Sequence, residues 1–229
     1  MKPYQKIIIR ECYEPLVAIP ATEFVLEMPP AYVKLGADYG SKSPYYLRKG
    51  VLERLLQANR HLQEIKPGWR IKVFDAYRPL SVQKFMVEYV FKSLCREKGL
   101  NPDSLDEGTR RALYEQVYQI WAVPSDNPLT PPPHSTGAAV DITLVDEKGE
   151  LVAMGGEIDD LSPVSHPDYY ANATEAPATG YHRNRQILWE IMTVAGFCRH
   201  PGEWWHFSHG DQMWAWLTNK PSAIYGRID

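Results

Sequence analysis

The chain has 229 residues, of which 44% are hydrophobic and 23% are charged, and its formal net charge is −3. This composition is that of an ordinary globular protein of one domain, which buries enough surface to fold without disulfides. The small net charge excludes a broad electrostatic attraction to nucleic acid or to an anionic membrane, so we expect a small molecule as the partner.

The cysteines and the apolar runs indicate a cytoplasmic protein. Cys12, Cys95 and Cys198 are far apart and form no Cys-x-x-Cys pair, so we expect buried free thiols. The apolar run at residues 7–9 is too short for the h-region of a signal peptide. Apolar runs elsewhere fall short of a membrane span.

Residues 1–43 contain short β-like pieces broken by proline and glycine, and we expect this arm to wrap the domain. Tyrosines in such an arm usually pack on the core, but they can also reach a pocket. Apolar residues at helical spacing predict a core-facing helix over residues 47–64, and residues 70–75 alternate as a strand. The tyrosines of the first segments are Tyr32, Tyr39, Tyr45 and Tyr46.

Arg78 follows this strand and precedes Pro79, which disfavours a helical conformation for Arg78 and holds it extended or in a turn. An arginine displayed there either points into a cleft or pairs with an acidic neighbour at the surface. Ser81 is the expected N-cap of a helix that runs to residue 97. A second helix is expected over residues 107–123, and the methionine and aromatic stripe of the pair should belong to the core.

A proline-rich loop over residues 124–133 leads directly into His134 and should form a stiff wall. Apolar and polar residues then alternate over 139–144, which predicts a strand whose Asp141 faces away from the apolar set. Gly137 gives the chain the freedom to bend between them. We therefore expect the side chains of His134 and Asp141 to reach one metal ion.

Residues 146–149 predict a turn into a return strand over residues 150–154. Residues 155–180 show no clear periodicity, and an uninterrupted loop of that length tends to be a lid or a binding loop. A helix is expected over residues 184–195, with Gly196 as its left-handed C-terminal cap.

A last set of strands should begin near residue 197. Glu203 and His206 are an odd number of residues apart, so one regular strand would place their side chains on opposite faces. We therefore expect a loop or bulge at Glu203 and a strand that begins near Trp205. A short helix over residues 213–217 closes the domain.

Two imidazoles and a carboxylate, from His134, Asp141 and His206, are the ligand set of a catalytic zinc site that leaves one coordination position for water. Glu203, beside the last of these ligands, is the candidate base. On residue type alone, the alternatives to His206 as ligand are His200 and His209.

Several short motifs follow one another in a specific order. They are Asp75-Ala76-Tyr77-Arg78-Pro79, His134-x-x-Gly137-x-Ala139-x-Asp141, Met154-Gly155, Asn184-Arg185 and Glu203-x-x-His206. In this order they resemble the zinc D-alanyl-D-alanine dipeptidases of the vancomycin-resistance type, which belong to a larger group of zinc D,D-peptidases acting on cell-wall peptides. The resemblance implies a single α+β domain over residues 1–229, with a central, mainly antiparallel sheet flanked by helices and zinc in a cleft on the sheet.

The resemblance also implies zinc-dependent hydrolysis of the dipeptide D-Ala-D-Ala to D-alanine, with one zinc ion per chain. Glu203 would be the general base and Arg78 would stabilise the transition state. Asp159 would bind the ammonium group of the zwitterionic substrate, with Asp160 as the alternative.

The contact to the substrate carboxylate is less clearly marked in the sequence. Pro132 has neither a side-chain nor a backbone donor at a position where enzymes of the resistance type tend to carry a hydroxyl. Ser135 or another segment would then bind the carboxylate, or the preferred second residue of the substrate would differ.

Two rival functions stay open at this stage. One is a zinc D,D-carboxypeptidase or endopeptidase acting on longer wall peptides, against which the lack of an apparent export signal argues. The other is a binding protein with a structural zinc, against which Glu203 and Arg78 argue because neither is needed to hold a metal. A homo-oligomer is compatible with the sequence.

Overall fold

A mixed five-stranded sheet forms the centre of the computed structural model, which describes residues 2–228. Its strands run in the order β3 (Val25–Leu26), β5 (Arg70–Asp75), β6 (Ala139–Val145), β8 (His206–Ser208) and β7 (Cys198–Arg199). β3 and β5 are parallel, whereas all other neighbours are antiparallel. The predicted α+β class is confirmed, and the parallel edge pair makes the sheet mixed.

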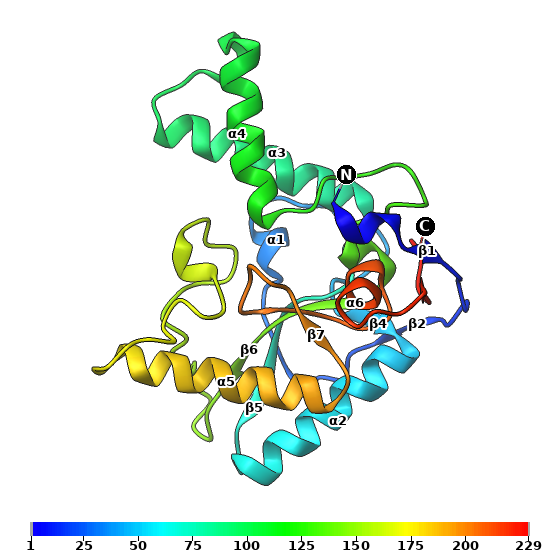
Figure 1. Cartoon of the computed structure of the whole chain (residues 1–229), viewed down its shortest axis with the longest axis vertical. Helices are drawn as coiled ribbons and strands as arrows, with labels where there is room; N and C mark the ends of the chain where they lie inside the picture. The colour runs from blue at the N-terminus through cyan, green and yellow to red at the C-terminus, as the bar shows by residue number, and fades with distance from the viewer. Residues whose placement is uncertain (1, 229) are drawn as a thin grey trace.

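The helices and the two small sheets surround this central sheet (Figure 1). The α-helices are α1 (Ala31–Lys34), α2 (Lys49–Ile65), α3 (Leu80–Glu97), α4 (Glu107–Ile120), α5 (Ala178–Val194) and α6 (Gln212–Leu217). Short 3-10 helices are η1 (Pro3–Lys6), η2 (Pro102–Ser104), η3 (Pro133–Thr136) and η4 (Pro163–Ser165). The small sheets pair β1 (Ile8–Ile9) with β9 (Ser222–Ala223), and β2 (Leu16–Ala18) with β4 (Tyr46–Arg48). No helix in the described residues is long and apolar enough to cross a membrane.

One face of the sheet packs against α2 and α5. Every second residue of β6 and β5 joins the same buried cluster as the apolar sides of these two helices. These strand residues are Val140, Ile142 and Leu144 in β6 and Ile71 and Val73 in β5. Because side chains alternate along a strand, Asp141 faces the opposite side, as its position in the sequence predicts.

A second buried cluster lies between α3, α4 and the N-terminal segment, and the two helices stand together at the top of Figure 1. Met86, Phe91 and Trp121 belong to this cluster, which confirms the methionine and aromatic stripe as core. Pro79 occupies the N-cap of α3, and the helix begins at Leu80 without a side-chain cap. The prediction of Ser81 as the N-cap was therefore wrong, and this residue lies in the first turn.

Three further sequence expectations need correction. The predicted strand over residues 150–154 is reduced to an isolated bridge between Val145 and Leu151, because Asp146 ties the loop by accepting the N–H groups of Lys148 and Glu150. α5 begins at Ala178 rather than near residue 184, although it ends before Gly196 as expected. In the left-handed cap, Gly196 has a φ of 88°. Of the three cysteines expected to be buried, Cys95 is buried, Cys198 is partly buried and Cys12 is exposed.

The N-terminal segment contacts distant parts of the chain. β1 runs parallel to the C-terminal β9, and β3 forms an edge of the central sheet. η1 lies beside α6 (Figure 1), where Gln212 donates a hydrogen bond of 2.6 Å to the Ile7 carbonyl and Tyr4 is buried. The start of the segment is therefore held against the last helix of the domain.

Candidate functional site

Three elements bring the predicted ligands together on the face of the sheet that α2 and α5 leave free. His134 lies in η3, and Gly137 then turns the chain into β6 with a φ of 69°. Asp141 of β6 and His206 of β8 are direct cross-strand partners. The local bend that the sequence predicts at Gly137 is therefore what places His134 over these two strands.

The donor atoms of these three residues converge. Nε2 of His134 lies 3.1 Å from Nδ1 of His206 and 3.2 Å from Oδ2 of Asp141. Nδ1 of His206 lies 3.0 Å from Oδ1 of Asp141. All three residues are buried, and within residues 2–228 they are the one group of His, Cys, Asp or Glu side chains close enough to share a metal ion. His209 instead turns its Nδ1 to the Gly196 carbonyl at 2.8 Å.

The protonation pattern of this group suits a divalent cation. Nδ1 of His134 donates to the carbonyl of Ala76 at 2.6 Å, which leaves a lone pair on Nε2 facing the cluster. Burial lowers the pKa of His206, so this imidazole is neutral. Burial raises the pKa of Asp141, but its contacts with His134 and His206 hold it well below its ordinary value. A carboxylate and two imidazoles are an N/O set that zinc accepts.

Glu203 lies beside this group, in the turn that precedes β8, as expected from its odd spacing to His206. Its Oε2 is 3.8 Å from Nδ1 of His206, and only 4% of the residue is exposed. Burial and the negative charge of Asp141 raise the pKa of Glu203 well above its ordinary value. A buried carboxyl of raised pKa accepts a proton more readily than an exposed one, as a general base must.

His200 contacts the other oxygen of Glu203 but does not act as a donor to it. Nδ1 of His200 lies 3.3 Å from Oε1 of Glu203 and accepts the N–H of Gly202 at 3.1 Å. Burial and the nearby His206 lower the pKa of His200 to about 3. A neutral imidazole that accepts a backbone N–H leaves Glu203 available for a proton from another source.

Arg78 is fixed at the floor of the site by several hydrogen bonds. Its Nε donates to Asp75 at 3.0 Å, Nη1 donates to Gln83 at 2.9 Å, and Nη2 donates to the Tyr32 hydroxyl at 2.9 Å and to Asp141 at 3.3 Å. These bonds leave one Nη1 hydrogen without a partner among the described residues. Burial lowers the pKa of Arg78, but Tyr32, Asp75 and Asp141 raise it well above its ordinary value, so the guanidinium stays charged.

Asp159 approaches the same site from the segment between β6 and α5. Its backbone has a φ of 68°, and its Oδ2 accepts the Tyr32 hydroxyl at 2.9 Å. Burial and the charge of Asp141 raise the pKa of Asp159 to about 7. Asp160 points elsewhere, since its Oδ1 accepts the N–H of Ser162 at 2.7 Å. Of the two aspartates, Asp159 is therefore the one that lines the pocket.

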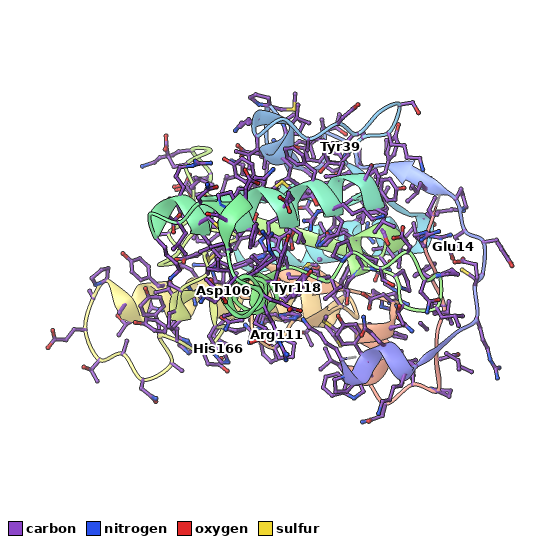
Figure 2. All side chains as sticks on the ribbon, turned by 90° about the horizontal axis from the view of Figure 1, so that it is seen from above. Glu14, Tyr39, Asp106, Arg111, Tyr118 and His166 are labelled. Atoms are coloured by element: carbon purple, nitrogen blue, oxygen red, sulfur yellow. The ribbon has the colours of Figure 1, made fainter. Side chains whose placement is uncertain are left out.

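Arg185 anchors the segment that carries Asp159. This segment projects to one side of the molecule, where Figure 2 labels His166. The Arg185 side chain is 1% exposed, and its guanidinium donates to three backbone carbonyls of the segment. The accepting residues are Met154 at 2.7 Å, His166 at 2.9 Å and Val164 at 3.0 Å. Arg185 therefore holds the segment that carries Asp159 and does not contact the candidate metal ligands.

One pocket, which opens to solvent and has a volume of about 450 Å³, is lined by the three candidate ligands and by Arg78, Asp159, His200 and Glu203. Ser135 is fully buried, and its hydroxyl donates to the Pro132 carbonyl at 2.8 Å, whereas Pro133 forms the adjoining part of the wall. Gln83 and Lys2 also line the pocket. Sequence reasoning missed both, because one lies in a helix predicted as scaffold and the other has no motif around it.

Comparisons with known proteins agree with the resemblance. Residues 26–223 match the model of the family described as Peptidase M15, D-ala-D-ala dipeptidase. A D-alanyl-D-alanine dipeptidase of Synechocystis is 50% identical over 241 residues, which cover 100% of this chain and 98% of the relative. One from Escherichia coli is 42% identical over 140 residues, or 61% of this chain and 55% of the relative. A solved vancomycin-resistance D,D-pentapeptidase with Zn(II) shares 14% identity with a TM-score of 0.46, over 96% of each chain.

Proposed function

The chain belongs to the D-Ala-D-Ala dipeptidase family of metallopeptidases, and from this premise we propose that it hydrolyses D-Ala-D-Ala to D-alanine with a bound zinc ion. The observation that carries the proposal is the arrangement of one pocket. A ligand group of two imidazoles and a carboxylate meets a buried carboxyl and a charged arginine there, and another carboxyl lies within the same wall.

His134, Asp141 and His206 would hold the zinc ion through Nε2, a carboxylate oxygen and Nδ1, the atoms that face one another. When bound, zinc makes a water molecule more acidic and polarises a peptide carbonyl. The bond from Nδ1 of His134 to the Ala76 carbonyl fixes the tautomer of this ligand. This hydrogen bond therefore keeps the lone pair of His134 on Nε2, the atom that would bind the metal ion.

Glu203 would take the proton of the attacking water and give it to the leaving amine when the peptide bond breaks. Its Oε2 lies 3.8 Å from Nδ1 of His206, which places Glu203 beside the three candidate ligands. Burial and the charge of Asp141 raise the pKa of Glu203, which favours the form that has accepted the proton. The same side chain would then carry this proton from the water to the leaving amine.

Arg78 would stabilise the negative charge that develops on the scissile carbonyl oxygen. The guanidinium is held by Asp75 and Gln83, so it needs no reorganisation when that charge appears. One hydrogen on Nη1 lacks a protein partner in the described chain, which leaves a donor for the substrate. A fixed donor of this kind typically contributes a rate factor of about a hundred to a thousand.

Asp159 would bind the substrate's ammonium group. The hydroxyl of Tyr32 donates to Oδ2 of Asp159, and the same hydroxyl accepts a hydrogen bond from Nη2 of Arg78. This chain of hydrogen bonds links the ammonium site to the oxyanion site. A substrate whose free amino group lies one residue from the scissile bond would use both sites at once.

The experiment that tests this function measures D-alanine release from D-Ala-D-Ala by the zinc-loaded full chain. Glu203→Gln preserves the shape of the side chain but not its basicity, so kcat should fall by about a hundred- to ten-thousandfold while bound zinc stays at one ion per chain. A longer wall peptide ending in D-Ala-D-Ala is the comparison substrate. Preferential cleavage of that peptide would reassign the chain as a carboxypeptidase, and zinc binding without turnover of either substrate would make it a binding protein.

A further inference from the structure

Lys2 lines the same pocket from the opposite end of the chain. The pocket wall contains two Lys or Arg side chains, Lys2 and Arg78. The charge of Arg78 is matched by carboxylates, since its Nη2 lies 2.9 Å from Asp75 and 3.3 Å from Asp141. Lys2 makes no ion pair with a carboxylate of residues 2–228, so it is the cation that the pocket leaves unmatched.

The backbone of Lys2 is fixed although its ammonium is not. Its N–H donates to Oε1 of Gln5 at 2.9 Å and its carbonyl accepts the N–H of Gln5 at 3.1 Å, at the start of η1. Tyr4, in the same turn, is 6% exposed and lines the pocket with Lys2. The protein partner of Nζ is the Tyr118 carbonyl at 3.5 Å, near the end of α4, where Figure 2 labels Tyr118. A bond of that length leaves the ammonium free to take a better acceptor.

The pocket contains groups of both charges. Asp159 and Lys2 line it together with Glu203. Figure 1 shows the N-terminal helix and the segment after β6 on different sides of the central strands. Two distant segments of the chain therefore bring a negative group and a positive group to one pocket.

We propose that Lys2 binds the C-terminal carboxylate of the dipeptide. The inference rests on the proposed function and adds the carboxylate site that this function leaves unassigned. Pro132 has no donor, and the Ser135 hydroxyl already donates to the Pro132 carbonyl. Asp159 and Lys2 line the same pocket, so a bound dipeptide, which spans roughly 7 Å when extended, would have its ammonium at Asp159 and its carboxylate at Lys2.

Lys2→Met in the zinc-loaded full chain tests this role, because methionine keeps the length of the apolar stem and removes the charge. KM for D-Ala-D-Ala should rise by about ten- to a hundredfold, the usual effect of losing a hydrogen bond to a charged group, while kcat changes little. Lys2→Arg should restore most of the affinity. Lys6→Met, an exposed lysine in the same helical turn, is the matched control and should leave KM unchanged.

D-Ala-D-Ala amide separates carboxylate binding from other effects of Lys2. The amide lacks the terminal charge, so its KM should be the same for the wild type and for Lys2→Met. Calorimetric titration of D-Ala-D-Ala into Glu203→Gln, with and without Lys2→Met, should show the same ten- to hundredfold loss of affinity without turnover.

The failures are distinguishable. A wild type that releases no D-alanine refutes the proposed function. If the wild type turns over the substrate and Lys2→Met leaves KM unchanged, only the role of Lys2 is refuted. The same conclusion follows if Lys2→Met raises KM equally for D-Ala-D-Ala and for its amide. If Ser135→Ala weakened the binding of D-Ala-D-Ala and Lys2→Met did not, the carboxylate site would be assigned to Ser135.

Discussion

Replacement of Arg78 by methionine separates the catalytic role of this residue from its structural role. The guanidinium is buried between Asp75 and Asp141, and Asp75 is only 1% exposed. Methionine fills similar space but leaves Asp75 without its ion pair. Because Asp141 keeps two imidazole neighbours, the main structural penalty falls on Asp75.

The size of this penalty follows from the pKa of the orphaned carboxyl. Burial raises the pKa of Asp75, and Arg78 is the main opposing influence, so its removal leaves the carboxyl protonated. A carboxyl whose pKa is about 3.9 in the unfolded chain needs about 4 kcal/mol to be held protonated at pH 7, which is an upper bound on the loss. In a chain of this size each kcal/mol lowers Tm by roughly 2–4 °C, so the expected decrease is up to about 8–16 °C.

The penalty should depend on pH in one direction. With the folded-state pKa of Asp75 above its unfolded-state pKa, the folded protein binds more protons, and stability falls as pH rises between the two values. The difference between variant and wild type should shrink to at most about 1.5 kcal/mol at pH 5. Catalysis should fall by about a hundred- to a thousandfold in kcat at both pH values, because the oxyanion donor is gone at either pH.

Thermal unfolding by circular dichroism at pH 5 and pH 7, with kinetics well below Tm, measures both effects. Arg185→Met is the control, since Arg185 is equally buried but bonds to carbonyl groups rather than carboxylates. Its loss of stability should not change between the two pH values. A kcat within tenfold of wild type in Arg78→Met would refute the catalytic role, and a pH-independent decrease in Tm would refute the charge argument.

The remaining predictions concern Asp159 and the metal. The pKa of Asp159, raised to about 7 by burial, predicts that kcat/KM falls as pH falls through about 7, because the protonated carboxyl no longer attracts an ammonium group. Asp159→Asn should lower kcat/KM and remove its decrease at acid pH. If the decrease remained in this variant, it would have to come from another titrating group. A chelator should lower Tm, and zinc at a hundredfold excess over its Kd should restore about 2.7 kcal/mol, or roughly 5–11 °C. His206→Ala should lose most of that response; an equal response would place the metal elsewhere.

The parts of the fold that the sequence predicts well are those with strong local patterns. β5 has the predicted bounds, and β6 extends one residue past the predicted strand, because their alternation reflects burial of one face against α2 and α5. The motif order also predicts the convergence of His134, Asp141 and His206, although their roles remain proposals. The bend at Gly137 and the irregular backbone at Glu203 were also predicted correctly. Both follow from backbone geometry, which does not depend on contacts with distant segments.

The parts that the sequence does not predict depend on contacts between distant segments. The parallel pairing of β3 with β5 joins residues 25–26 to residues 72–73, and two-residue strands carry no periodicity. α5 begins earlier than expected because the first turn has a weak apolar pattern. Gln83 and Tyr32 bind Arg78 from a helix and from the N-terminal segment, and neither shows a motif that would identify this role.

The opposite charges of Asp159 and Lys2 give the strongest physical reason to expect a free dipeptide as the substrate. Both side chains line one pocket, and their charges match the ammonium and carboxylate of a short zwitterion. A wall peptide has an acylated nitrogen in place of the ammonium. It would desolvate the Asp159 carboxylate without supplying a cation, and a buried charge that loses its partner costs several kcal/mol. The same carboxylate that would attract the dipeptide would therefore disfavour the longer substrate.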